Sequence, residues 1–132
     1  MKAAQIRISR PTDKLKELIH FYRDGLGLKT IGSFEDHAGY DGIMLGMPDA
    51  SVHLEFTQHE AGSPCPAPTK DNLLVLYFNN SQNYQAALTQ MRSIAAKEVT
   101  PENPYWLGKS TSFEDPDGWG VILFDGLFSP AV

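Results

Sequence analysis

The chain has 132 residues, a length that suits one domain built around a single core. Hydrophobic residues make up 42% and charged residues 20%, which is typical of a globular domain in water. The formal net charge is -5 and no block of lysine or arginine occurs, so we expect no nucleic-acid partner. No apolar run approaches the ~20 residues of a membrane helix, so we expect no membrane partner.

The N-terminal stretch and the cysteine content favour a cytoplasmic protein. The stretch "MKAAQIRISRP" lacks the apolar region of a signal peptide. The single cysteine, Cys65, cannot form a disulfide within the chain. We therefore expect a cytoplasmic location.

The first half predicts a strand, a helix and three further strands. The segment "AAQIRIS" alternates, with Ile6 and Ile8 on one face, as a half-buried strand does. Thr12 or Asp13 is then expected to cap a helix over 15–22. Strands follow at 28–35, 42–47 and 51–58, separated by turn-rich segments.

The second half repeats this order. Residues 72–79 read as a strand that is apolar on both faces, and residues 84–95 carry the apolar spacing of an amphipathic helix. Strands are expected at 97–100, 109–114 and 120–125, the last two joined by the type I turn "DPDG".

The repeated βαβββ pattern predicts an α+β fold of two tandem modules within one domain over 1–132. Module one covers about 1–58, a linker rich in proline covers 59–71, and module two covers 72–132. Each module has one helix to cover one face of its sheet. We therefore expect two curved mixed sheets that enclose a cleft.

This pattern resembles the vicinal oxygen chelate superfamily, which includes glyoxalase I, bleomycin-resistance proteins, fosfomycin-resistance enzymes and extradiol dioxygenases. Three stretches carry the resemblance: "LIHFYRDGLGLKTIG", "VHLEFTQ" and "FEDPDGWGVIL". The match spans nearly the whole chain in the family's order. It implies the fold and leaves the reaction open, because this fold hosts many chemistries and some pure binders.

The resemblance also implies positions for the ligands of the metal that many members hold. The first, commonly His, falls at Gln5, and the second, commonly Glu, falls at Glu55. The third falls at Leu73, or at Asn72 if the register slips by one, and the fourth falls at Ile122. Leucine and isoleucine cannot bind an ion, so we expect no metal centre of the family type and no cofactor.

Strand periodicity predicts which side chains line the cleft. The polar set is Gln5, Arg7 and Ser9 on the first strand, and His53, Glu55 and Thr57 on the fourth. The module-two strands contribute apolar residues, namely Leu73, Val75, Tyr77, Ile122 and Phe124. This lining suits a small amphiphilic or aromatic molecule with a polar or anionic end.

Two interpretations of Arg7 and Glu55 stay open. In this fold the first and fourth strands are neighbours, so the two side chains are expected to pair. The pair either closes the polar wall as a structural ion pair, or leaves Arg7 to hold a carboxylate or phosphate through two parallel bonds.

His53 and Glu55 are also the alternative metal pair and the candidate catalytic residues. Side chains at i and i+2 share a strand face, and a third ligand for a divalent ion would come from His37, His59 or Asp41. Without a metal, Glu55 could remove a proton or orient His53 to do so. The plain interpretation is a cleft histidine hydrogen-bonded to Glu55.

Four aromatic residues on predicted loops complete the candidate ligand-binding set: His37, Tyr40, Tyr105 and Trp106. Tyr105 and Trp106 have a second interpretation, in which they pack on the domain edge or in a dimer contact.

Three hypotheses of function follow. The first is a metal-independent protein that binds a small molecule. The second is a lyase, isomerase or dioxygenase with a divalent ion at a rearranged His/Glu site, and the third is an interaction protein with a vestigial cleft. Whether the chain is an enzyme stays open. We expect a homodimer, because small modules bury more surface that way.

Overall fold

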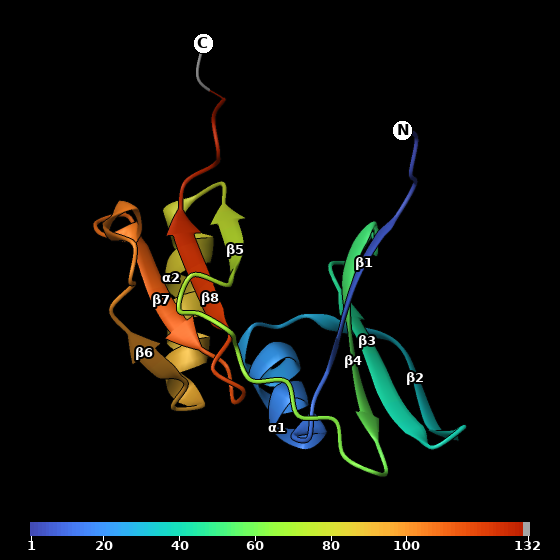
Figure 1. Ribbon diagram of the computed structural model, residues 1–132. Helices are drawn as coiled ribbons and strands as arrows, with labels where there is room; N and C mark the ends of the chain where they lie inside the picture. The colour runs from blue at the N-terminus through green and yellow to red at the C-terminus, as the bar shows by residue number, and fades with distance from the viewer. Residues whose placement is uncertain (131–132) are drawn as a thin grey trace. The chain divides into compact units, whose positions relative to one another are not determined.

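The computed structural model describes residues 1–130, which fall into two compact units (Figure 1). Module one comprises Met1–Cys65, and module two begins at Pro66. Each module has one four-stranded mixed sheet. The predicted α+β fold of two tandem βαβββ modules is confirmed.

Module one consists of four strands and a helical segment that changes from α to π geometry. Its elements are β1 (Ile6–Pro11), α1 (Leu15–Ile19), η1 (His20–Gly25), β2 (Lys29–His37), β3 (Tyr40–Gly46) and β4 (Val52–His59). The strand order is β1-β4-β3-β2, so β1 is an edge strand. It pairs in parallel with β4, and the other pairs are antiparallel.

The first helix begins at Leu15, the first residue of the predicted range, but neither Thr12 nor Asp13 is its N-cap. Its N-cap is Lys14, whose own side chain makes no capping bond. Thr12 Oγ1 accepts from the Lys14 N–H at 2.8 Å, and Gln58 Oε1 on β4 accepts from the Leu15 N–H at 3.1 Å. The helix start is therefore satisfied partly by a neighbouring strand, which residue type alone does not reveal. At the other end Gly27 has a φ of 77°, a conformation that favours glycine.

Module two repeats the order with a longer helix. Its elements are β5 (Leu73–Phe78), α2 (Ser81–Ser93), β6 (Lys97–Val99), η2 (Pro104–Trp106), β7 (Ser110–Glu114) and β8 (Gly120–Asp125). The strand order is β5-β8-β7-β6. Figure 1 shows α2 lying along one face of this sheet, and it buries Tyr84, Leu88 and Met91 there. The Asn80 side chain caps α2 by accepting from the Asn83 N–H at 2.8 Å.

The apolar face of module one is covered less completely than the sequence predicts. Phe56 is 2% exposed and packs on Tyr22 of η1 at 4.8 Å between ring centroids. On the same face Ile6 is 54%, Ile8 52% and Val52 47% exposed, so the burial predicted for Ile6 and Ile8 is wrong. The helical segment is short and reaches only the Phe56 end of the sheet.

Among the described residues, neither helix combines the length and apolar character that a membrane crossing requires.

Candidate functional site

Four polar side chains of module one form a cluster on the sheet face that α1 and η1 leave uncovered. They are Arg7 and Ser9 of edge strand β1, and His53 and Glu55 of β4. The parallel register places Arg7 opposite His53 and Ser9 opposite Glu55. We call these four residues the polar ladder. Two lateral pairs in register place all four side chains within reach of one another.

The polar ladder is internally hydrogen-bonded. Arg7 Nε donates to His53 Nε2 at 3.0 Å, and Arg7 Nη1 approaches Glu55 Oε2 at 3.4 Å. Ser9 Oγ donates to the other oxygen, Glu55 Oε1, at 2.7 Å. Both carboxylate oxygens of Glu55 and the Nε2 atom of His53 are therefore engaged.

These bonds determine the tautomer of His53. A guanidinium group can only donate hydrogen bonds, so His53 Nε2 must accept from Arg7. The proton then sits on Nδ1, which donates to the backbone carbonyl of Ala50 at 3.0 Å. His53 is 7% exposed, and its neutral ring is held by Arg7 on one side and by the Ala50 carbonyl on the other.

The structure confirms one predicted contact and corrects another. Arg7 and Glu55 form the predicted ion pair, with side chains that are 48% and 15% exposed. The expected hydrogen bond between His53 and Glu55 is wrong, because His53 bonds to Arg7 and Ala50 instead. Residues i and i+2 of one strand are ~7 Å apart, whereas a neighbour on the next strand is ~5 Å away.

The candidates for a third metal ligand, His37, His59 and Asp41, lie at the end of the sheet opposite to His53. His53 pairs with Gly46 at the end of β3, whereas His59 pairs with Tyr40 at its start and Asp41 pairs with Gln58. His37 pairs with Tyr40 as well. Six residues of strand separate the two ends, or about 20 Å.

The alternative ligand set of His53, Glu55 and His37 is therefore not assembled. Among residues 1–130, no group of three or more His, Cys, Asp or Glu side chains is placed to hold a metal ion. Glu55 keeps a carboxylate at the position that the resemblance assigns to the second ligand, and His53 lies in the same cluster, but residues 1–130 place no third His, Cys, Asp or Glu with them.

The remaining candidates of module one are not members of the polar ladder. Gln5 is exposed and precedes β1. His37 and Tyr40 flank the β2–β3 turn, where the Tyr40 ring meets His59 at 4.6 Å between centroids. The structure thus brings together Arg7, His53 and Glu55, places His37 and Tyr40 at the other end of the sheet, and leaves Gln5 exposed just before β1.

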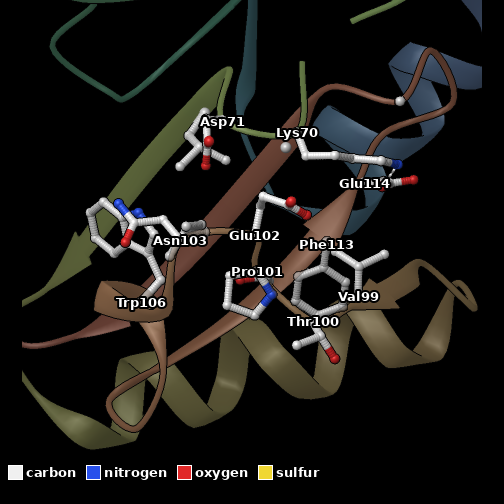
Figure 2. A pocket seen from close by; sticks show the side chains of 15 residues that line it. Lys70, Asp71, Val99, Thr100, Pro101, Glu102, Asn103, Trp106, Phe113 and Glu114 are labelled. Atoms are coloured by element: carbon white, nitrogen blue, oxygen red, sulfur yellow. Dashed lines mark hydrogen bonds and ion pairs between the residues drawn. The ribbon is translucent and has the colours of Figure 1, made fainter.

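In module two, Trp106 lines a pocket and Tyr105 does not. Trp106 of η2 meets Phe124 of β8 at 6.1 Å between ring centroids, and Tyr105 is 68% exposed. Figure 2 shows Trp106 and Asn103 at one end of the pocket and Lys70 reaching Glu114 at the other. Hydrogen bonds from Lys70, and then from Lys97, hold the pKa of the Glu114 carboxyl below its ordinary value.

Two of the family's ligand positions contribute to the wall of this pocket. Ile122 is fully buried, and Leu73 packs across Gly120, where a Cβ atom would come within 2.5 Å of Leu73 Cδ2. The positions to which the resemblance assigns the third and fourth metal ligands are therefore apolar residues of the pocket wall.

Sequence reasoning missed most of the residues that line this pocket, among them Ser112 and Asn103. Strand alternation in "STSFE" could have placed Ser112 on the same face as Ile122, its register partner. Asn103 is in the pocket because of the loop conformation, for which the sequence carries no comparable signal. The carbonyl of Ala50 was also missed, since a backbone acceptor depends on the turn that presents it.

The fold and the comparisons with known proteins now identify the class. Two tandem βαβββ modules with these strand orders form the fold of the vicinal oxygen chelate superfamily, so the resemblance found in the sequence is confirmed. Residues 6–57 match the YycE-like N-terminal domain, and residues 71–125 match the YycE-like C-terminal domain. The chain belongs to the YycE-like family.

A relative and its crystal structure support this assignment. The chain is 49% identical over 124 residues to protein YycE of Bacillus subtilis strain 168, covering 94% of this chain and 89% of that protein. A YycE crystal structure from Bacillus subtilis aligns with a TM-score of 0.92 and 46% identity, over 100% of this chain and 96% of that one. The function of that YycE protein is unknown.

More distant structures share the fold. A FosX variant from Listeria monocytogenes, in complex with Mn(II) and 1S,2S-dihydroxypropylphosphonic acid, aligns with a TM-score of 0.72 at 15% identity, over 97% of this chain and 96% of that one. The antibiotic-binding protein TnmS3 from Streptomyces sp. CB03234 aligns with a TM-score of 0.66 at 18% identity, over 96% and 98%. Likeness at this level of identity establishes the fold alone.

Proposed function

We propose that this protein binds a small amphiphilic or aromatic molecule whose carboxylate or phosphate end is held by Arg7. The observation that carries the proposal is that two side chains hold the Arg7 guanidinium in one orientation. His53 accepts from its Nε at 3.0 Å, and Glu55 lies 3.4 Å from its Nη1. The side chain is 48% exposed, so its other N–H groups are open to a ligand.

This arrangement favours anion binding because the guanidinium is oriented before a ligand arrives. A long arginine side chain loses rotamer freedom when it binds an anion, and that cost is smaller when the side chain is already held. Apart from these two bonds, the Arg7 N–H groups have no hydrogen-bond partner within residues 1–130. Planar N–H groups of this kind match a carboxylate or phosphate through paired, charge-assisted bonds.

Three features support binding without the superfamily's usual metal centre. The resemblance places the third and fourth ligands at Leu73 and Ile122, which carry no donor atoms. At the alternative third position, the Asn72 Oδ1 atom already accepts from the N–H and the hydroxyl of Thr69. Both ring nitrogens of His53 are engaged in hydrogen bonds. Both carboxylate oxygens of Glu55 lie against protein donors, so a cation would have to displace Arg7 or Ser9.

The proposal is tested by thermal unfolding with phenyl phosphate and benzoate as probes, with and without EDTA. We expect both probes to raise the melting temperature equally in the two conditions. Arg7→Met should weaken probe binding about 10- to 100-fold, the effect of losing hydrogen bonds to a charged group. Arg23→Met is the matched control, because Arg23 is half-exposed on η1 and pairs only with its neighbour Asp24.

Two results would overturn the proposal in different directions. Stabilisation that EDTA abolishes, together with about one metal ion per chain by elemental analysis, would favour the metal-dependent lyase, isomerase or dioxygenase. Less than a tenth of a metal ion per chain after supplementation would exclude that alternative. No stabilisation by either probe would favour the interaction protein with a vestigial cleft.

A further inference from the structure

Module two contains a buried hydroxyl group that has no protein partner and lines a pocket. The Ser112 side chain belongs to a residue that is 7% exposed, and its Oγ accepts and donates no hydrogen bond within residues 1–130. Buried hydroxyl groups are nearly always satisfied, because losing bonds to water without replacement is unfavourable. An unsatisfied one beside a pocket therefore points to a partner from outside the chain.

Strand alternation aims this hydroxyl away from α2 and into the pocket. On either side of it, Thr111 Oγ1 lies 2.8 Å from the hydroxyl of Tyr84 on α2, and Phe113 is fully buried. Neighbouring side chains on a strand point to opposite faces, so Ser112 faces the side that α2 does not cover. Ser112 is among the residues that line the pocket there.

Part of the wall of the pocket around Ser112 is apolar and already formed. Ile122 and Leu73 provide one wall, and Trp106 provides another from the loop after β6. That loop is held at three points: Asn103 Oδ1 accepts from the Tyr105 N–H at 3.0 Å, Ser110 Oγ donates to the Trp106 carbonyl, and the Trp106 ring meets Phe124. A ligand would therefore bind without having to order this segment.

The charges around the pocket favour a neutral group. The Glu114 carboxylate at its edge is neutralised by Lys70 at 2.7 Å and Lys97 at 3.0 Å. Both lysines are thereby engaged, and Asp71 and Glu102 add further negative charge to the lining of the pocket (Figure 2). Two lysines thus face three carboxylates, so an anion would find no net positive charge here, and a cation would meet the apolar part of the wall.

We propose that the Ser112 pocket is a binding site for a neutral hydroxyl or carbonyl group carried on a small apolar body, with Ser112 as its hydrogen-bond partner. The free volume of the pocket is about 20 Å³, whereas a single water-sized group needs roughly 10–15 Å³. The polar group enters, and the apolar body lies against Trp106 and Leu73. This site belongs to module two alone and does not depend on anion binding at Arg7.

The test is a titration of the full-length protein with benzyl alcohol and with toluene, followed by amide NMR spectra. We expect saturable shifts at Ser112, Asn103 and the Trp106 indole, with benzyl alcohol binding more tightly than toluene. Ser112→Ala should weaken benzyl alcohol binding about 2- to 10-fold, the effect of one neutral hydrogen bond, and leave toluene binding unchanged. Ser93→Ala is the matched control, because Ser93 is exposed on α2 and bonds only to the Gln90 carbonyl.

The outcomes separate this proposal from the one for module one. Arg7→Met should leave benzyl alcohol binding unchanged, whatever it does to phenyl phosphate. Absence of saturable shifts at the three pocket residues would overturn the proposal, and would mean that Ser112 is satisfied by water alone. Equal affinity of benzyl alcohol for the parent chain and Ser112→Ala would overturn it as well.

Discussion

At the scale of single residues, the hydrogen bonds of the polar ladder hold the Arg7 guanidinium in one orientation. Arg7 and Glu55 could pair in many geometries, but His53 restricts Arg7 to one of them by accepting from Nε. His53 is in turn fixed by the Ala50 carbonyl, in a turn where Ala50 has a φ of 56°. The position of the guanidinium thus depends on a backbone turn three residues away from His53.

The tautomer of His53 is the first testable consequence. We expect ring nitrogen NMR to show His53 neutral and protonated at Nδ1, because Nε2 accepts from Arg7. His20, which is exposed and pairs with Asp24, serves as the reference ring in the same spectrum. A proton on Nε2 of His53 would contradict the hydrogen bonding described for the polar ladder.

Substitutions of Arg7 and His53 should lower the free energy of unfolding by different amounts. Arg7→Met should lower the free energy of unfolding by less than about 1 kcal/mol, because a half-exposed ion pair contributes little. His53→Ala should lower it by about 2–3 kcal/mol, since it removes a buried ring and two hydrogen bonds. Urea unfolding measures both, and His20→Ala is the control for an exposed histidine.

At the scale of elements, Glu114 ties β7 to two other segments. Lys70 reaches it from the chain before β5, and Lys97 reaches it from β6. The Glu114 side chain is 9% exposed, so this arrangement is shielded more than the surface pair Arg92–Glu98. Shielded charge-assisted bonds are stronger than exposed ones.

The stability contributed by Glu114 should depend on pH in a defined direction. Its pKa is lower in the folded protein than the ordinary value of 4.5, so the contribution is present above that value and is lost as pH falls through the folded pKa. Glu114→Gln should therefore lower the free energy of unfolding by about 1 kcal/mol at pH 7. This difference should shrink as the pH falls below 4.5 and through the folded pKa of Glu114.

Urea unfolding at a series of pH values tests this expectation. Glu98→Gln is the matched control and should have a smaller effect at pH 7, because Glu98 and Arg92 are both about half-exposed. A constant difference between Glu114→Gln and the parent chain from pH 7 to pH 3 would show that packing, not charge, is responsible.

At the scale of the whole molecule, the exposed apolar patch of module one is the feature that favours association with a second chain. The patch is Ile6, Ile8 and Val52, with Ile6 directly opposite Val52 in the parallel register. Apolar residues gathered on an edge strand are a liability for a single chain in water. The patch supports the homodimer expected from the sequence, which stays a prediction.

Light scattering after size exclusion tests the homodimer. We expect a mass about twice the 14.6 kDa of one chain, and Ile8→Glu should shift the protein to a single chain. Ile31→Glu is the control. Ile31 is exposed as well, at 41%, but it lies near Gly46 on the opposite face of the sheet. A single-chain mass for the parent protein, or a dimer that survives Ile8→Glu, would contradict the prediction.

How much of the fold and of the site could be predicted depends on how far apart in the sequence the interacting residues lie. Strand and helix positions depend on hydrophobic periodicity within a few residues, and module boundaries depend on prolines and glycines, so both are legible in the chain. The Arg7–Glu55 pair was predictable once the family's strand order was known. That the two modules form one domain stays a prediction as well.

The sequence by itself determined the duplicated βαβββ pattern, the superfamily and the polar character of the β1 and β4 face. Only the tertiary structure decided which partner each polar group meets. Register set Arg7 against His53, the Ala50 turn chose the histidine tautomer, and the loop carrying Trp106 formed a pocket over Ser112. The physical reason is that periodicity assigns a side chain to a face, whereas a hydrogen bond requires two atoms within about 3 Å, and that distance is set by segments far apart in the chain.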